Sequence, residues 1–207
     1  MCGAFGGEVT GPTKYNKRGQ FENTNIRQNI VKPYLVSIGC DPLGQWPLPD
    51  VPKLLPRFMT DSGRLRRAVT NVMLGQGYKG QQPWYYKGAK MASSWPLWQS
   101  AFPKCKWIIV RRKDKDIANS CMKTAFMRAF DTTDGWQKWI DEHKARFDEM
   151  TTAGLDIYEV WPQKIVNNDL SEIKWVIDEI GLIWNEQAVR DFVSPALWSA
   201  SKKRRTK

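Results

Sequence analysis

The spacing of apolar residues changes several times along the chain and predicts alternating helices and strands. In the first half, helical spacing runs from about residue 21 to Pro33, which should interrupt or end that helix. A second helix should begin at a cap on Asp61 or Ser62 and stop near Gly75 or Gly77. Residues 1–20 are glycine-rich and polar, and residues 41–56 contain five prolines, so both stretches are predicted to be irregular.

The second half combines short apolar runs with longer helical patterns. Strands are predicted at residues 84–86, 107–110 and 155–160. Helices are predicted at residues 94–102, 114–130, 133–150, 171–180 and 185–193. Because strands that alternate with helices form parallel sheets, the pattern predicts one α/β domain over residues 1–200, followed by a basic tail at 201–207.

Two clusters account for almost all of the net charge of +11. The last six residues carry five positive charges, which is typical of a solvated tail. The segment 104–124 carries seven basic and two acidic residues where a predicted strand meets a predicted helix. Since a helix N-terminus presents free N–H groups, this second cluster indicates a bound anion.

Cysteine and hydropathy patterns exclude several classes of protein. Cys2, Cys40, Cys105 and Cys121 have no CxxC spacing, and the single His143 cannot complete a zinc set with them, so we predict no metal site. No apolar run approaches the roughly 20 residues of a membrane span, and the start of the chain has no signal-peptide pattern. We therefore expect a cytoplasmic protein with free thiols and no membrane partner.

The residues after the strand at 107–110 are the candidate site. Arg112 can offer a planar fork to a phosphate, and Ser120, two turns into the next helix, can add a hydroxyl. The alternative is a solvated charge cluster in which Asp114 only caps the helix. Both interpretations stay open on the residues alone.

Residues 106–120, KWIIVRRKDKDIANS, resemble the 3′-phosphate-binding segment of sulfotransferases that use 3′-phosphoadenosine 5′-phosphosulfate (PAPS). In that family an apolar strand ends in an arginine, a KD-type pair follows, and a serine comes eight residues after the arginine. The resemblance implies that Arg112 and Ser120 bind the 3′-phosphate, with Arg111 as an extra arginine beside them.

Two further stretches match the family in the expected order. Residues 84–106 are similar to the WxxKxPR, LPLW and FPxAK run of bacterial-type members, which implies that Lys87 lies beside the transferring sulfuryl group and that Lys90 is a basic neighbour. Residues 180–186 are similar to the LGLPWDE element, and residues 18–23 to a substrate-side segment of marine phage and bacterial relatives. The resemblance covers about residues 80–193 and implies a three-layer α/β/α parallel sheet of the P-loop sulfotransferase type.

The chain also departs from the family pattern. The P-R/K-S-G-T-[ST] loop that holds the 5′-phosphosulfate, and the strand before it, have no counterpart, nor does the RKGxxG element of the vertebrate branch. The position of the vertebrate catalytic histidine is Ala89. Glu22, or Glu8, is then a candidate to take the proton from an acceptor hydroxyl. The alternative for Glu22 is a carboxylate favoured by the dipole at a helix start.

The resemblance implies that a sulfuryl group passes from PAPS to a hydroxyl or amine of a small molecule or glycan, leaving adenosine 3′,5′-bisphosphate. One alternative is a non-catalytic basic protein that binds nucleic acid, which should instead spread its charge over a whole face. Another is a remnant of the sulfotransferase fold with a structural role. The concentration of charge at one strand–helix junction favours the small anion.

Sulfuryl transfer should be weak or absent in this 207-residue chain by itself. Losing one preorganised donor of a phosphosulfate loop can cost about 10²–10³ in rate, and here several are missing. The measurement is transfer from labelled PAPS to a panel of hydroxyl acceptors, with a version extended by a strand, a P-R-S-G-T-S loop and a helix as the comparison. Robust turnover by the short chain would contradict the prediction.

Overall fold

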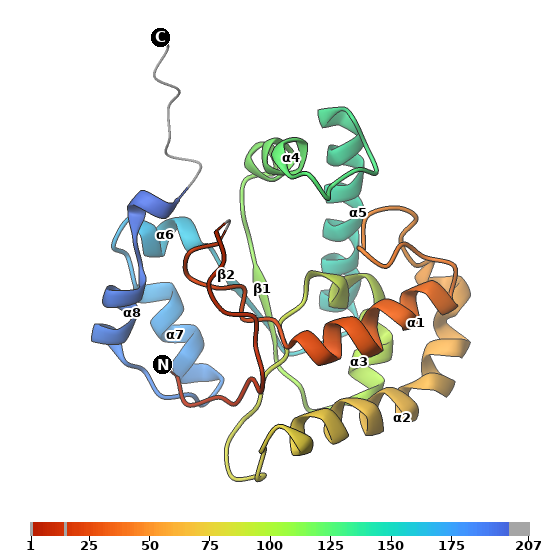
Figure 1. Cartoon of the computed structure of the whole chain (residues 1–207), viewed down its shortest axis with the longest axis horizontal. Helices are drawn as coiled ribbons and strands as arrows, with labels where there is room; N and C mark the ends of the chain where they lie inside the picture. The colour runs from red at the N-terminus through yellow and green to blue at the C-terminus, as the bar shows by residue number, and fades with distance from the viewer. Residues whose placement is uncertain (1, 15, 199–207) are drawn as a thin grey trace.

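Helices surround a small parallel sheet in this computed structural model, which describes residues 2–14 and 16–198 (Figure 1). The sheet pairs β1 (Trp107–Val110) with β2 (Ile157–Val160). The α-helices are α1 (Lys32–Ser37), α2 (Val51–Gly75), α3 (Trp95–Ala101), α4 (Asp114–Lys123), α5 (Thr133–Thr152), α6 (Pro162–Val166), α7 (Ser171–Glu179) and α8 (Glu186–Phe192). A π-helix, η1 (Ile26–Val31), and two 3₁₀ helices, η2 (Ala89–Ser94) and η3 (Pro195–Leu197), complete the elements. The α/β class is thus confirmed, whereas the predicted tail at 201–207 lies outside the described residues.

The two strands run in parallel register, from Trp107 opposite Ile157 to Val110 opposite Val160. Trp107 and Ile109 are buried, while Ile108 and Val110 are 44% and 63% exposed on the other face. Parallel sheets are usually covered on both faces, so this face of β1 is unusually open within the described part of the chain.

The strand predicted at residues 84–86 does not form. Trp84 makes only an isolated parallel bridge to Phe5 in the N-terminal segment. Within the described residues this pairing consists of two backbone hydrogen bonds, from Phe5 N–H to Pro83 C=O and from Tyr85 N–H to Phe5 C=O. The chain then turns at Gly88 into η2, so the ladder ends after one pair.

The helix boundaries predicted from prolines in the first half of the chain are wrong. Pro33 does not end its helix, because η1 continues directly into α1 with Pro33 in the first turn of the new segment. A π-helical stretch before a proline lets the backbone continue where an i→i−4 bond is missing. Likewise α2 begins at Val51 rather than near residue 61, with Asp50 as the N-cap accepting from Lys53 N–H at 3.2 Å.

The other predicted helices form close to their predicted bounds, except that α4 stops at Lys123 rather than near residue 130. The Thr124 hydroxyl donates to the Ser120 carbonyl at 2.7 Å, and Thr124 leaves the helix with extended backbone. A local side-chain bond of this kind competes with the helical backbone bond. The chain then forms a turn before α5.

Two apolar clusters hold the helices in place. The larger joins α2, α3 and the first helical segment to β1, with Phe58, Val69, Leu97 and Trp107 among its buried members. The smaller lies between α4 and α5 around Trp136, which is 0% exposed. None of the described helices is both long and apolar enough to cross a membrane.

Asn23 ties the N-terminal segment to the start of one helix and the end of another. Its amide nitrogen donates to Gly6 C=O at 3.0 Å and to Gln76 Oε1 at 2.7 Å, and its Oδ1 accepts from Ile26 N–H at 3.1 Å. The side chain is buried, with an exposed fraction of 1%. One polar group therefore fixes the loop that carries Glu22 against α2.

Asn23→Ala should lower the free energy of unfolding by about 2 kcal/mol, because each buried group left without a partner costs about 1–3 kcal/mol. Urea denaturation followed by tryptophan fluorescence measures the change. Asn71→Ala, at an exposed position on α2, is the control and should change stability by less than about 0.5 kcal/mol. Equal effects of the two substitutions would contradict this role of Asn23.

Candidate functional site

The junction between β1 and α4 leaves a helix N-terminus open. Lys113 is the N-cap and offers no side-chain hydrogen bond to the helix, so the alternative in which Asp114 caps the helix is wrong. The Asp114 carboxylate instead accepts from Lys144 Nζ at 3.1 Å and Gln137 Nε2 at 3.4 Å, both on α5. No described side chain caps the first N–H groups of α4, which suit an anion.

Arg112 lies at this junction with a buried donor that has no partner. Its Nε is buried and makes no hydrogen bond to any described residue. Its guanidinium carbon lies 5.0 Å from the centroid of the Trp198 ring. A buried donor without an acceptor costs about 1–3 kcal/mol, more when it is charged, so the structure is short of an anionic acceptor at this point.

The neighbouring Arg111 is already engaged. Its guanidinium forms an ion pair with Glu159 of β2 and lies 4.7 Å from the centroid of the Phe147 ring on α5. Its backbone N–H donates to Val160 C=O at 2.8 Å, which extends the ladder by one residue. Arg111 therefore holds the sheet to α5, and Arg112 is the arginine left for a ligand.

Ser120 lies on α4, half-buried, with a hydroxyl that makes no hydrogen bond to a described residue. The pKa of the next residue, Cys121, is raised by burial, and the positive charge of Arg112 partly opposes this effect. Arg112 is thus within electrostatic range of the turn that carries Ser120. No hydrogen bond joins Arg112 to Ser120 within residues 2–14 and 16–198, so a ligand would have to bridge them.

The remaining predicted residues gather in a second group. Lys87 Nζ donates to Gln20 C=O at 2.6 Å, and the Glu22 carboxylate pairs with Arg27 at 3.0 Å. Burial lowers the pKa of Lys90, and the negative charge of Glu22 opposes that shift. The structure thus brings Glu22, Lys87 and Lys90 to one place, although no described hydrogen bond or ion pair links them to Arg112 or Ser120.

Sequence reasoning missed Arg27 and Tyr86 in this second group. Arg27 holds Glu22, and the pKa of Tyr86 is raised by burial and by the charge of Glu22. Arg27 lies five residues after Glu22 within an apolar helical pattern, so spacing alone gave no reason to choose it. The ion pair with Arg27, at 3.0 Å, makes Glu22 a structural residue as well as a candidate base.

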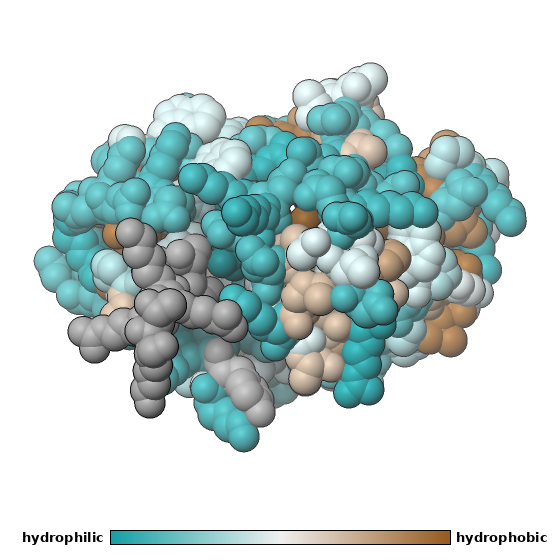
Figure 2. Space-filling view, turned by 90° about the horizontal axis from the view of Figure 1, so that it is seen from above, coloured by the Kyte–Doolittle hydropathy of each residue, from teal (hydrophilic) through white to brown (hydrophobic). Residues whose placement is uncertain are grey.

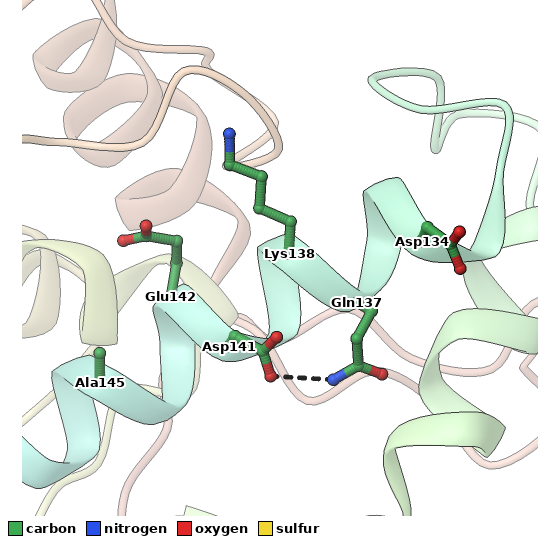
Figure 3. Close-up of a pocket in the computed structure, with 6 residues that line it drawn as sticks. All are labelled: Asp134, Gln137, Lys138, Asp141, Glu142 and Ala145. Carbon is green, nitrogen blue, oxygen red and sulfur yellow. Dashed lines mark hydrogen bonds between the residues drawn. The ribbon is translucent and has the colours of Figure 1, made fainter.

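One surface depression, of about 440 Å³, lies on the side of α5 (Figure 3). Its lining comes from one helix, at Asp134, Gln137, Lys138, Asp141, Glu142 and Ala145. Gln137 Nε2 donates to Asp141 Oδ1 at 2.9 Å, so part of its polar lining is satisfied within the helix. It contains none of the predicted residues, and we do not assign it to the site.

The face at the α4 end of the molecule is mainly hydrophilic (Figure 2). A light-brown patch lies to the right of the grey atoms and brown residues lie along the right edge, while most of the visible surface is polar. No group of three or more His, Cys, Asp or Glu side chains among the described residues can hold a metal ion.

Comparisons with protein-family models, curated proteins and solved structures found no match for this chain. The function is consequently argued from the site and from the motifs quoted above.

Lys90→Met should stabilise the protein most near neutral pH. Because burial lowers the pKa of Lys90 in the folded protein, the unfolded chain binds this proton more tightly. Burying the charged lysine therefore destabilises the natural protein, and this destabilisation is fully present at pH values below the folded-state pKa. It disappears as the pH rises to the ordinary lysine value of about 10.4. Denaturant unfolding of both proteins between neutral and alkaline pH measures the difference. An advantage of the variant that grows with pH would contradict the prediction.

Proposed function

We propose that the chain binds a nucleotide 3′-phosphate between β1 and α4 and is a PAPS-dependent sulfotransferase-type protein. The observation that supports this proposal most is the buried Arg112 Nε, which has no acceptor in the described part of the chain and lies next to a first turn of α4 that no described side chain caps. A three-layer α/β/α arrangement is part of this proposal.

The described donors at the junction fit a phosphate. Arg112 would supply a charge-assisted bond, the Ser120 hydroxyl another, and the first N–H groups of α4 the remainder. Asp114, in the first turn, does not close the site, because its carboxylate is turned toward Lys144 on α5. The alternative of a solvated charge cluster does not explain why Arg112 Nε is buried.

The second group of residues suits transfer to an acceptor. PAPS supplies the sulfuryl group, whose bond to the 5′-phosphate breaks as the acceptor oxygen attacks in line. Glu22 would take the proton of that hydroxyl, and the Lys87 ammonium would neutralise charge on the leaving phosphate. Both side chains must then exchange their present partners, Arg27 and Gln20 C=O. The acceptor is a small molecule or glycan in this proposal.

Adenosine 3′,5′-bisphosphate should bind, and adenosine 5′-monophosphate should bind far more weakly, because only the first offers a 3′-phosphate to Arg112. Charge-assisted bonds contribute roughly 1.5–3 kcal/mol, so Arg112→Ala should weaken binding at least tenfold. Calorimetric titration measures both effects.

Arg67→Ala, which removes an exposed guanidinium from α2, is the matched control and should leave nucleotide affinity unchanged. Equal affinity for the two nucleotides would overturn the assignment. Tight, salt-sensitive binding of DNA or RNA in place of the nucleotide would favour the nucleic-acid alternative.

A further inference from the structure

A second cavity, of about 240 Å³, lies between the loop that joins α1 to α2 and the turn that joins α4 to α5. Figure 1 shows this loop and this turn on the same side of α5. The cavity contains no residue of the proposed nucleotide site. It is smaller than the roughly 300–1,000 Å³ typical of pockets for drug-sized ligands, so its ligand must be small.

One buried side chain fixes the two walls of this cavity. Gln45, 3% exposed, donates from Nε2 to Phe126 C=O at 2.7 Å. Its Oε1 accepts from the backbone N–H of Arg128 at 2.7 Å and of Ala129 at 3.0 Å. All three bonds cross from the loop to the turn, so the cavity is preorganised.

The loop itself is also held in shape. Asp41 Oδ2 accepts from Gln45 N–H at 2.8 Å, and Gly44 N–H donates to Asp41 C=O at 2.9 Å. Gly44 has φ +73, and a Cβ there would lie 2.9 Å from Lys90 Cγ. Glycine is therefore required both by the backbone conformation and by the close approach of Lys90.

The cavity is lined by large apolar side chains that face water. Leu43 is 40%, Trp46 39% and Phe126 58% exposed. Exposed apolar groups that gather around one preformed cavity mark a binding site more often than scattered ones do. The space between these three side chains suits one apolar side chain of a ligand.

Two opposite charges complete the lining. One oxygen of the Asp41 carboxylate accepts from Gln45 N–H, and the other has no hydrogen-bond partner among the described residues. Arg128 uses its Nε to bond Ala125 C=O at 2.8 Å, and its two terminal nitrogens make no hydrogen bond to a described residue. A ligand that carries one cation and one anion beside an apolar group matches all three features.

We propose that this cavity binds a free α-amino acid with an apolar side chain. Its ammonium pairs with Asp41, its carboxylate with Arg128, and its side chain packs against Leu43, Trp46 and Phe126. The lining of this cavity shares no residue with the proposed nucleotide site, although Lys90 packs against Gly44 in the same loop.

Calorimetric titration with L-phenylalanine, N-acetyl-L-phenylalanine and L-phenylalaninamide tests the proposal at about pH 6, where α-amino groups are protonated. We expect the free amino acid to bind with a Kd on the order of a millimolar. The N-acetyl derivative lacks the cation and the amide lacks the anion, so each should bind about tenfold more weakly. Equal binding of the three ligands, or no binding of any, would overturn the proposal.

Variants that remove one charge test which residue binds the ammonium of the ligand and which binds its carboxylate. Asp41→Asn keeps an acceptor for Gln45 N–H and should abolish the preference for the free amino acid over its N-acetyl derivative only. Arg128→Gln should abolish the preference over the amide only. Trp46→Ala should weaken all binding, whereas Trp161→Ala, at a similarly exposed tryptophan of 37%, should not. Unchanged preferences in both charge variants would overturn the proposal even if the free amino acid binds.

Discussion

The four-residue parallel ladder between β1 and β2 is the constraint on which the candidate phosphate site depends. Alternate residues of a strand point to opposite faces, so the buried positions of Trp107 and Ile109 set the directions of the two arginines after the strand. The Arg111 side chain lies on the same side as Trp107 and Ile109, where it contacts Glu159 and Phe147. Arg112 lies on the same side as the exposed Val110, and its Nε has no acceptor among residues 2–14 and 16–198. A shift of one residue in register would exchange the two arginines.

This constraint also explains how far sequence reasoning could go. The strand at 107–110 and the helices α5, α7 and α8 agree with local periodicity, which is strong in those segments. The motif placed both arginines at the strand end, but only the observed register and the ion pair with Glu159 tell them apart. That pair joins residues 48 positions apart, and no local pattern encodes it.

Errors arose where tertiary packing outweighed a local preference. Pro52 and Pro56 predicted an irregular connection, yet α2 includes both because its buried face, with Phe58 and Leu65, packs in the larger core. Aromatic residues predicted a strand at 84–86, but among the described residues Phe5 alone pairs with this segment. Gln45 was not identified at all, since its role depends on a turn about 80 residues later in the chain.

Lys90 connects the candidate catalytic group to the rest of the molecule. Its aliphatic stem packs against Gly44 in the loop of the second cavity. Burial lowers the pKa of Lys90, and the charges of Glu22, Arg27 and Asp41 also affect this pKa. Burying a lysine costs free energy unless carboxylates compensate, and Glu22 and Asp41 provide that compensation in part. The loop before η1 and the loop before α2 are therefore held around one partly buried cation.

A crystal structure of the chain with adenosine 3′,5′-bisphosphate tests most directly whether the β1–α4 junction is a phosphate site. We predict that the 3′-phosphate lies within hydrogen-bonding distance of Arg112 Nε and of the first N–H groups of α4, while the Arg111–Glu159 pair stays intact. A nucleotide bound elsewhere, with Arg112 Nε still lacking an acceptor, would contradict the assignment.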